Sequence, residues 1–260
     1  MPALSASSTV HPVAAFLADL GIGRGDTVLM HAAFAGLSRC GFRAEDVADQ
    51  LVDALAAGTI AMPTMSWRAV NPDHPVFDER ATPSITGVLT ETFRTRCAGP
   101  RSLHPTHSVA AAGRAAAWLT ADHHRDRTPC GPQSPWGRLA EADAVVVMLG
   151  CGMETCTLVH YLEETVAPDV YLRDEEETYR CIDRNGEEFA VTTRRHRKLV
   201  RNFHKFEALL RSRGLVRDGV LAGVPAFAFR ARDLIALGMQ HMHTDPFGTR
   251  AAPGEDGKLM

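Results

Sequence analysis

The hydrophobic pattern in the middle of the chain predicts a buried strand, a turn and a helix. Residues 145–149, V-V-V-M-L, are all apolar, which is typical of a strand that is buried on both faces. Gly150 and Gly152 then predict a turn. Thr155 or Thr157 is expected to begin the helix as an N-cap, because a hydroxyl can accept a hydrogen bond from a free backbone N–H there.

Similar patterns divide the rest of the chain into strands and helices. Strands are expected at 27–31 and 58–63 with a helix at 44–57 between them, and this order predicts a parallel pair joined by a right-handed crossover. Further helices are expected at 11–20, 86–96, 114–121, 136–141, 199–213 and 231–239, and strand segments at 214–229.

The second half of the chain contains a clear hairpin signal. Alternating stretches at 169–180 and 187–195 flank Asn185-Gly186, a dipeptide that strongly indicates a β-hairpin. No repeat or linker interrupts the chain, so we expect one α/β domain over residues 1–260. Its central sheet is expected to be mixed and mostly parallel and flanked by helices, with the hairpin as an excursion at about 169–195. Residues 248–260 are expected to form a flexible tail.

Composition and charge narrow the range of functions. The chain has 260 residues, of which 45% are hydrophobic, and this is enough for a sizeable core. A net charge of −3 argues against general affinity for nucleic acid or membranes. No apolar run approaches the roughly 18 residues of a membrane span. Residues 1–10 lack the charged and apolar regions of a signal peptide, so we expect a cytoplasmic protein.

The spacing of cysteines and histidines does not predict a metal site. The six cysteines contain no Cys-x-x-Cys and are expected to be reduced thiols. His104 with His107, and His123 with His124, are possible ligand pairs, but neither has a carboxylate or thiol at ligand spacing. We therefore expect no metal ion.

The helix after the central strand carries the clearest candidate for chemistry. His160 is followed by Glu163 and Glu164, three and four residues later, which places an acid beside the imidazole on one helix face. Open α/β sheets usually hold ligands just beyond the carboxyl ends of their strands. A neighbouring carboxylate can also keep a histidine basic. A partly buried structural histidine beside a salt-bridged helix end is the alternative.

Eight short motifs carry a family resemblance. They are V-L-M-H-A-A-F at 28–34, M-P-T at 62–64, F-D at 77–78, T-P-S at 82–84, R-S-L-H-P-T-H-S at 101–108, S-P at 134–135, and L-G-C-G with H-Y-L-E at 149–163. Together and in this order they resemble the aminoglycoside 3-N-acetyltransferase family, from about residue 10 to residue 247. The resemblance implies an α/β fold distinct from the common acetyltransferase superfamily, with acetyl-CoA as donor and a small-molecule amine as acceptor.

The resemblance also implies a direct transfer with a histidine in T-x-x-H-x-x-E as general base. In this chain that histidine is His160 and the matching acid is Glu163. An amine is mostly ammonium at neutral pH, so a base with a pKa near 7 suits the step. The Thr157 hydroxyl or a loop N–H is expected to stabilise the oxyanion that develops on the thioester.

Loops are expected to hold CoA, because the chain lacks the Gly-rich phosphate motif of the usual acetyltransferases. The candidate CoA contacts are Phe34, Ala35, Ser38, Arg101, Ser102, His104 and Ser108. Arg101 is expected to meet a phosphate as a forked donor, with a surface ion pair as the alternative. For His104 the resemblance favours a role in the cleft over a rigid turn with a hydrogen-bonded histidine.

The long stretch at 63–83 is expected to border the acceptor, since loops of this length inside a compact domain are usually functional or disordered. Thr64, Trp67, Asp73 and Asp78 are its candidate substrate contacts. Either aspartate is expected to lie near the substrate amine.

The chain departs from the family pattern at three uncharged positions and in the charge of the stretch after the hairpin. The family usually has serines at the positions of Ala32 and Ala33 and asparagine at that of Cys156. Aminoglycoside-acetylating members tend to have acidic residues after the hairpin. This chain instead has Arg194, Arg195, Arg197, Lys198 and Arg201.

If these basic residues line the cleft, they favour an acceptor with a carboxylate or phosphate over a polycation. If they form a solvated face, the acids available for a cationic acceptor are Asp73, Asp78, Glu163, Glu164 and the run 174–177.

Two other functions remain open at this point. One is a hydrolase on the same frame that uses His160, with Cys156 four residues earlier as a nucleophile. The other is a binding protein that keeps the fold without turnover. A homodimer is also left open.

Overall fold

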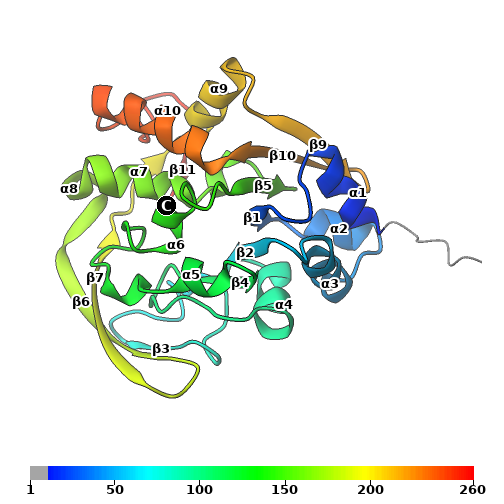
Figure 1. Ribbon diagram of the computed structural model, residues 1–260. Helices are drawn as coiled ribbons and strands as arrows, with labels where there is room; N and C mark the ends of the chain where they lie inside the picture. Colours follow the sequence, from blue (N-terminus) through cyan, green and yellow to red (C-terminus); the bar gives the residue numbers. More distant parts are fainter. Residues whose placement is uncertain (1–10) are drawn as a thin grey trace, which may run out of the picture.

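A central six-stranded sheet with helices on both faces organises the computed structural model, which describes residues 11–260 (Figure 1). In spatial order the strands are β4 (Val109–Gly113), β2 (Thr59–Pro63), β1 (Thr27–Ala32), β5 (Val145–Leu149), β10 (Val224–Arg230) and β9 (Arg217–Leu221). β2, β1 and β5 run parallel at the centre of the sheet. β4, β10 and β9 join at its two sides by antiparallel pairing. The predicted mixed α/β fold is confirmed.

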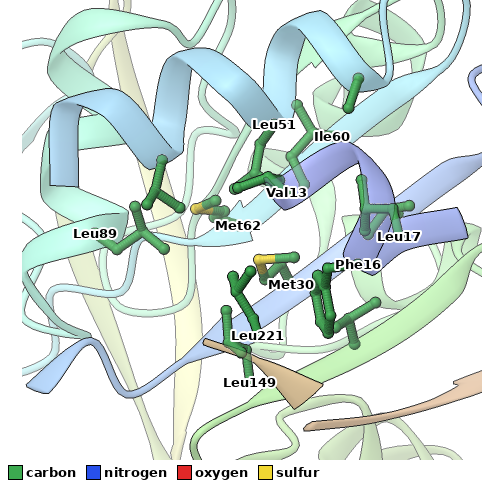
Figure 2. Packing of buried hydrophobic residues seen from close by; sticks show 14 of the residues in the cluster. Val13, Phe16, Leu17, Met30, Leu51, Ile60, Met62, Leu89, Leu149 and Leu221 are labelled. Carbon is green, nitrogen blue, oxygen red and sulfur yellow. The ribbon is translucent and has the colours of Figure 1, made fainter. Parts of the chain in front are cut away.

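Side chains of β5 alternate between two hydrophobic cores, which explains its uninterrupted apolar sequence. Val145, Val147 and Leu149 face one core, and Val146 and Met148 face the other. Figure 2 shows part of the first core, between the sheet and the amino-terminal helices. The helices of that core are α1 (Pro12–Asp19), α2 (Ala35–Arg39), α3 (Ala44–Ala54) and α4 (Val88–Arg96). Those of the other core are α5 (Ala116–Thr120), α6 (Pro135–Arg138), α7 (Leu158–Val166), α8 (Pro168–Tyr171), α9 (His204–Ser212) and α10 (Ala231–Thr244).

The predicted hairpin is confirmed and forms a second sheet. After the short helix α8 (Pro168–Tyr171), strands β6 (Leu172–Ile182) and β7 (Glu188–His196) pair in antiparallel fashion. Gly186 in their turn has a φ of 87°, a conformation that favours glycine. A third strand, β3 (Val76–Asp78), pairs with β6. The stretch at 63–83 is therefore not wholly irregular, because part of it extends this sheet.

The carboxyl-terminal part of the chain differs from two expectations. The helix expected at 199–213 begins only at His204, because Val200–Arg201 form the short strand β8. Residues 248–260, expected as a flexible tail, instead make defined contacts: β11 (Lys258–Leu259) pairs with β8.

Two expectations concerned a signal peptide and a membrane span. The expectation about a signal sequence concerns residues 1–10, which lie outside the described part of the chain. Within residues 11–260, none of the helices combines the length and apolar character that crossing a membrane requires.

Candidate active site

A large cavity opens at the carboxyl ends of the three parallel strands. Its volume is about 1480 Å³, and it is lined by His31 at the end of β1, Pro63 at the end of β2 and Cys151 just after β5. β1 lies between β2 and β5, so the strand order reverses direction at this point of the sheet. Open α/β sheets typically bind ligands in such a place.

His160 reaches this cavity from α7 and is backed by Glu163. His160 Nδ1 lies 2.7 Å from Glu163 Oε2, and the carboxylate is fully buried. Burial lowers the pKa of His160, although Glu163 partly opposes this effect. The imidazole is therefore neutral at neutral pH, with Nε2 available to take a proton.

The second oxygen of Glu163 is held by a cation and a hydroxyl. Arg201 Nε donates to Glu163 Oε1 over 2.8 Å, and the Thr249 hydroxyl donates to the same oxygen over 2.5 Å. Burial by itself would raise the pKa of Glu163, but His160 and Arg201 outweigh it and hold that pKa below its usual value. Glu163 is thus an oriented carboxylate behind His160.

A second histidine–glutamate pair lies directly beside the first. His196, the last residue of β7, stacks on His160 with ring centroids 4.3 Å apart and also lines the cavity. Its Nε2 lies 2.7 Å from Glu164 Oε1, and Glu164 Oε2 accepts a hydrogen bond from the Cys130 backbone N–H over 2.8 Å. Burial raises the pKa of Glu164 to about 8 and lowers that of His196 well below its usual value.

The histidines and carboxylates form hydrogen-bonded pairs in this structure. His160, Glu163 and His196 place their donor atoms within 4.8 Å of one another, as do Cys130, Glu164 and His196. In each histidine–glutamate pair the nitrogen and oxygen are only 2.7 Å apart. Two ligands of one zinc ion at about 2.0–2.2 Å each are usually farther apart than this. The absence of a metal ion remains a prediction.

Thr157 lies at the cavity but does not cap α7 with its hydroxyl. It occupies the N-cap position with helical backbone angles, and no side-chain cap hydrogen bond is formed there. Its hydroxyl instead donates to Met65 Sδ over 3.9 Å. The Thr155 hydroxyl donates to the Gly152 carbonyl, so the predicted hydroxyl cap at 155 or 157 is wrong.

The candidate CoA contacts divide into two groups. Phe34, Ala35 and Ser38 line the cavity at the start of α2. Arg101, Ser102, His104 and Ser108 do not line it, because they are buried in a network of their own.

Arg101 illustrates why this second group is enclosed. Its guanidinium donates to the Ser108 hydroxyl and to the carbonyls of Thr64, Glu79 and Thr82, and it stacks over Phe77. Burial lowers the pKa of Arg101 to about 9. The structure provides neither the expected phosphate contact nor the alternative surface ion pair.

Ser102 and His104 are held in the same interior region. The Ser102 hydroxyl lies 2.9 Å from His123 Nδ1, and His104 Nε2 lies 3.3 Å from the Thr193 hydroxyl. His104 Nδ1 accepts the backbone N–H of His107 over 3.0 Å. The expected cleft role of His104 is therefore not what this geometry provides.

Only one of the four acceptor candidates lines the cavity. That residue is Trp67, whose ring lies 6.0 Å from that of His107. The hydroxyl of Thr64 points to the interior, where it donates to the Ser108 carbonyl. Asp73 is exposed in a turn, and Asp78 accepts two backbone N–H groups of its own turn. The structure does not bring either aspartate to the site.

The basic stretch after the hairpin also divides. Arg195 and Lys198 line the cavity. Arg194 and Arg197 form ion pairs with Asp174 away from it, at 3.8 and 2.8 Å. Arg201 is the buried partner of Glu163 already described.

Several cavity residues were not among the candidate catalytic, CoA or acceptor residues. His107 lies between the two candidates His104 and Ser108, and its ring centroid is 4.9 Å from that of His196. His196 lies within the basic stretch. Only the register of β6 and β7, which pairs His196 with Leu172, brings it to the site. Lys258 and its neighbours reach the cavity through the pairing of β11 with β8.

Comparisons with known proteins find relatives along almost the whole chain. Residues 29–243 match the family model described as aminoglycoside 3-N-acetyltransferase. Aminoglycoside N(3)-acetyltransferase VII of Streptomyces paromomycinus is 30% identical, with 92% of each chain covered. Aminoglycoside N(3)-acetyltransferase III of Pseudomonas aeruginosa is 29% identical, with 94% of this chain and 96% of the relative covered.

Solved structures give the same result. A binary complex of AAC-IIIb with CoASH is 28% identical, has a TM-score of 0.74 and covers 92% of this chain and 97% of its own. A mutant of AAC(3)-IVa in complex with a gentamicin is 26% identical, has a TM-score of 0.76 and covers 93% of this chain and 90% of its own. On the family match and on the relative that is 30% identical over nearly its whole length, the chain belongs to the aminoglycoside 3-N-acetyltransferase family.

Proposed function

We propose that this protein transfers an acetyl group directly from acetyl-CoA to an amine, with His160 as general base. The observation that carries the proposal is the buried His160–Glu163 pair at the wall of the cavity. A volume of about 1480 Å³ exceeds the roughly 300–1,000 Å³ of single-ligand pockets and suits two substrates at once.

In the proposed reaction His160 Nε2 takes a proton from the acceptor nitrogen as that nitrogen attacks the thioester carbon. Glu163 holds the ring by Nδ1 and stabilises the imidazolium that forms. Arg201 and Thr249 keep Glu163 ionised and in place. The Thr157 hydroxyl stands in the cavity wall one turn before His160 and is our candidate for stabilising the oxyanion.

The cysteine-based alternative has weak chemical support. Burial raises the pKa of Cys156 to about 12, and burial also raises that of Cys151. A thiolate is the nucleophilic form of cysteine, so neither residue has the environment of a nucleophile.

The variant His160→Ala tests the general base. We expect kcat to fall by roughly 10²–10⁴-fold in an assay of CoA thiol release, because positioned bases typically contribute that much. CoA affinity, measured by calorimetry, should change little. Retention of more than about a tenth of the wild-type kcat would contradict the role of His160 as base.

The charges of the cavity wall favour an acceptor that carries a carboxylate or phosphate. The cationic lining residues are Arg43, Arg68, Arg173, Arg195, Lys198 and Lys258. Among the described residues Glu45 alone brings a side-chain carboxylate to the lining, and it pairs with Arg43 at 3.7 Å. The phosphates of CoA would use some of these cations, and the rest would repel a polycationic drug.

Reversal of one cavity charge, with its neighbour as control, tests the acceptor charge. Lys198 lines the cavity, whereas Arg197 pairs with Asp174 outside the lining. For an anionic amine we expect Lys198→Glu to lower kcat/KM roughly threefold to tenfold at low salt, and less at high salt. Arg197→Glu should have little effect. Efficient acetylation of aminoglycosides by the unmutated protein, with no gain on Lys198→Glu, would favour a cationic acceptor instead.

A further inference from the structure

We propose that His196, with Glu164 behind it, is a second catalytic pair that donates a proton to the departing thiolate of CoA while His160 accepts one from the amine. This inference rests on the proposed acetyl transfer. It assigns to His196 and Glu164 the acid half of a reaction for which His160 and Glu163 are the base half.

The geometry places both pairs on one wall of one cavity. Glu163 and Glu164 are consecutive on α7, and each contacts a different histidine at 2.7 Å. The two rings stack at 4.3 Å, so a proton acceptor and a proton donor would face the same reacting groups. His196 lines the cavity, and within residues 11–260 its side chain has a hydrogen-bond partner only at Nε2, which leaves Nδ1 free to donate in this proposal.

The two carboxyl groups differ in what holds their second oxygen. Glu163 Oε1 accepts hydrogen bonds from the cation Arg201 and from the Thr249 hydroxyl. Glu164 Oε2 accepts one from the neutral backbone N–H of Cys130. A cation stabilises the ionised form of Glu163, and no cation does so for Glu164 among the described residues. Environments that separate two such pKa values are a common basis for separate acid and base roles.

The titratable groups around Glu164 and His196 support the same assignment. Glu164 faces His196 on β7, Glu163 on α7, and Asp126 and the Cys130 thiol on the loop before α6. His196 faces His160 on α7, His107 and His104 on the segment before β4, and Arg201 on β8. The acids near Glu164 and the cation and imidazoles near His196 all disfavour an ion pair, and Glu164 therefore holds a proton at pH 7.

A neutral relay follows from these protonation states. At the start the Glu164 carboxyl donates to His196 Nε2, and His196 Nδ1 carries a proton. As the C–S bond breaks, Nδ1–H passes its proton to the sulfur, and the Glu164 proton moves to Nε2. The products are CoA thiol, a Glu164 carboxylate and a neutral His196. The proton that His160 took from the amine then returns to His196 Nδ1, and the Nε2 proton returns to Glu164.

A change of leaving group separates this role from a structural one. The variant is His196→Gln, measured with acetyl-CoA and with S-phenyl thioacetate, whose more acidic thiol needs no acid to depart. With acetyl-CoA we expect kcat to fall roughly a hundredfold with little change in KM. With the phenyl thioester the variant should approach the wild-type rate. His160→Ala should be slow with both donors, and His124→Gln, outside the cavity lining, should be normal with both.

The pH profile of Glu164→Gln gives a second readout. A glutamine amide can still donate to His196 Nε2 and so keep the same tautomer, but it has no proton to give up. In the wild type, kcat should be highest below the pKa of Glu164, which is about 8, and fall above it. The variant should be slower at pH 7 and lack that alkaline fall.

Two outcomes would overturn the inference. One is an equal loss with both donors in His196→Gln, which would indicate a structural role. The other is a wild-type alkaline limb in Glu164→Gln. Either result leaves the proposed acetyl transfer standing, whereas absence of turnover by the unmutated protein with every amine would remove the proposed function itself.

Discussion

Two buried arginines give this protein two polar networks of similar construction and different use. Arg201 holds Glu163, which holds His160 at the cavity wall. Arg101 holds Ser108 and three carbonyls in the interior, and it stacks on an aromatic ring as Arg201 does. Both arginines are almost fully buried.

The difference lies in what each network presents to solvent. The Arg201 network ends in an imidazole that lines the cavity, and so its charges can act on a bound substrate. The Arg101 network ends in hydroxyls and carbonyls that are bonded to one another, and none of its candidate residues lines the cavity. Burial and charge alone therefore do not mark a functional group. What separates the two networks is the imidazole of His160, which lines the cavity.

Removal of each arginine should give the largest effects and the sharpest contrast. Arg201→Met leaves Glu163 without its cation, which should cost about 3–5 kcal/mol in the free energy of unfolding. Arg101→Met leaves buried carbonyls unpaired, at about 1–3 kcal/mol each. Arg201 lowers the pKa of His160, so its loss should move the acidic limb of kcat to higher pH.

Urea unfolding measures the free energy of unfolding, and pH–rate profiles measure the position of the acidic limb of kcat. Arg101→Met should lose stability without moving the acidic limb. A matching shift of that limb in the Arg101 variant would show that the two networks are not separate. Arg101→Lys and Arg201→Lys serve where the methionine variants do not fold.

Glu163→Gln changes the Arg201 network, which reaches the cavity, and its effect should be intermediate in size. It removes a charged hydrogen bond worth about 1.5–3 kcal/mol, so kcat should fall roughly ten- to hundredfold, less than for His160→Ala. Glu163 raises the pKa of His160, and its neutralisation should move the acidic limb to lower pH, opposite to Arg201→Met. Shifts in the same direction in the two variants would contradict this account of His160.

His123, which contacts Ser102 in the interior away from the cavity lining, provides the test with the smallest effect at neutral pH. Its folded pKa is lowered by burial to about 3, against 6.5 in the unfolded chain. Below pH 6.5 the unfolded state binds a proton that the folded state does not, so stability is lost as pH falls. His123→Gln should flatten the slope of unfolding free energy between about pH 6 and 4 by about 1.4 kcal/mol per pH unit. An unchanged slope would show that His123 titrates alike in both states.

The sequence predicted what local patterns determine. The apolar run of β5 and the Asn185-Gly186 turn depend on neighbouring residues, and the structure confirms both. β8 and β11 were missed because two short strands far apart in sequence stabilise each other, and neither has a signal alone. The tail was misjudged for the same reason.

The site was predictable to the extent that it lies on one helix. His160 and Glu163 meet because α7 places residues three apart on one face. His196 and Lys198 reach the cavity through the pairing of β6 with β7. Arg101 is kept out of the cavity lining by hydrogen bonds to residues 19 to 37 positions away. Such long-range geometry cannot be obtained from spacing along the chain.

The adjacency of Glu163 and Glu164 on α7 limits which insertions the protein can tolerate. One residue inserted between 160 and 163 would turn the two carboxyl groups by about 100° relative to His160 and the start of the helix. Both histidines would lose their partners in that single event. The exposed tip of the hairpin at 184–188 can lengthen without disturbing either pair. Lineages of this protein should therefore show length variation at the hairpin tip and a fixed length in α7.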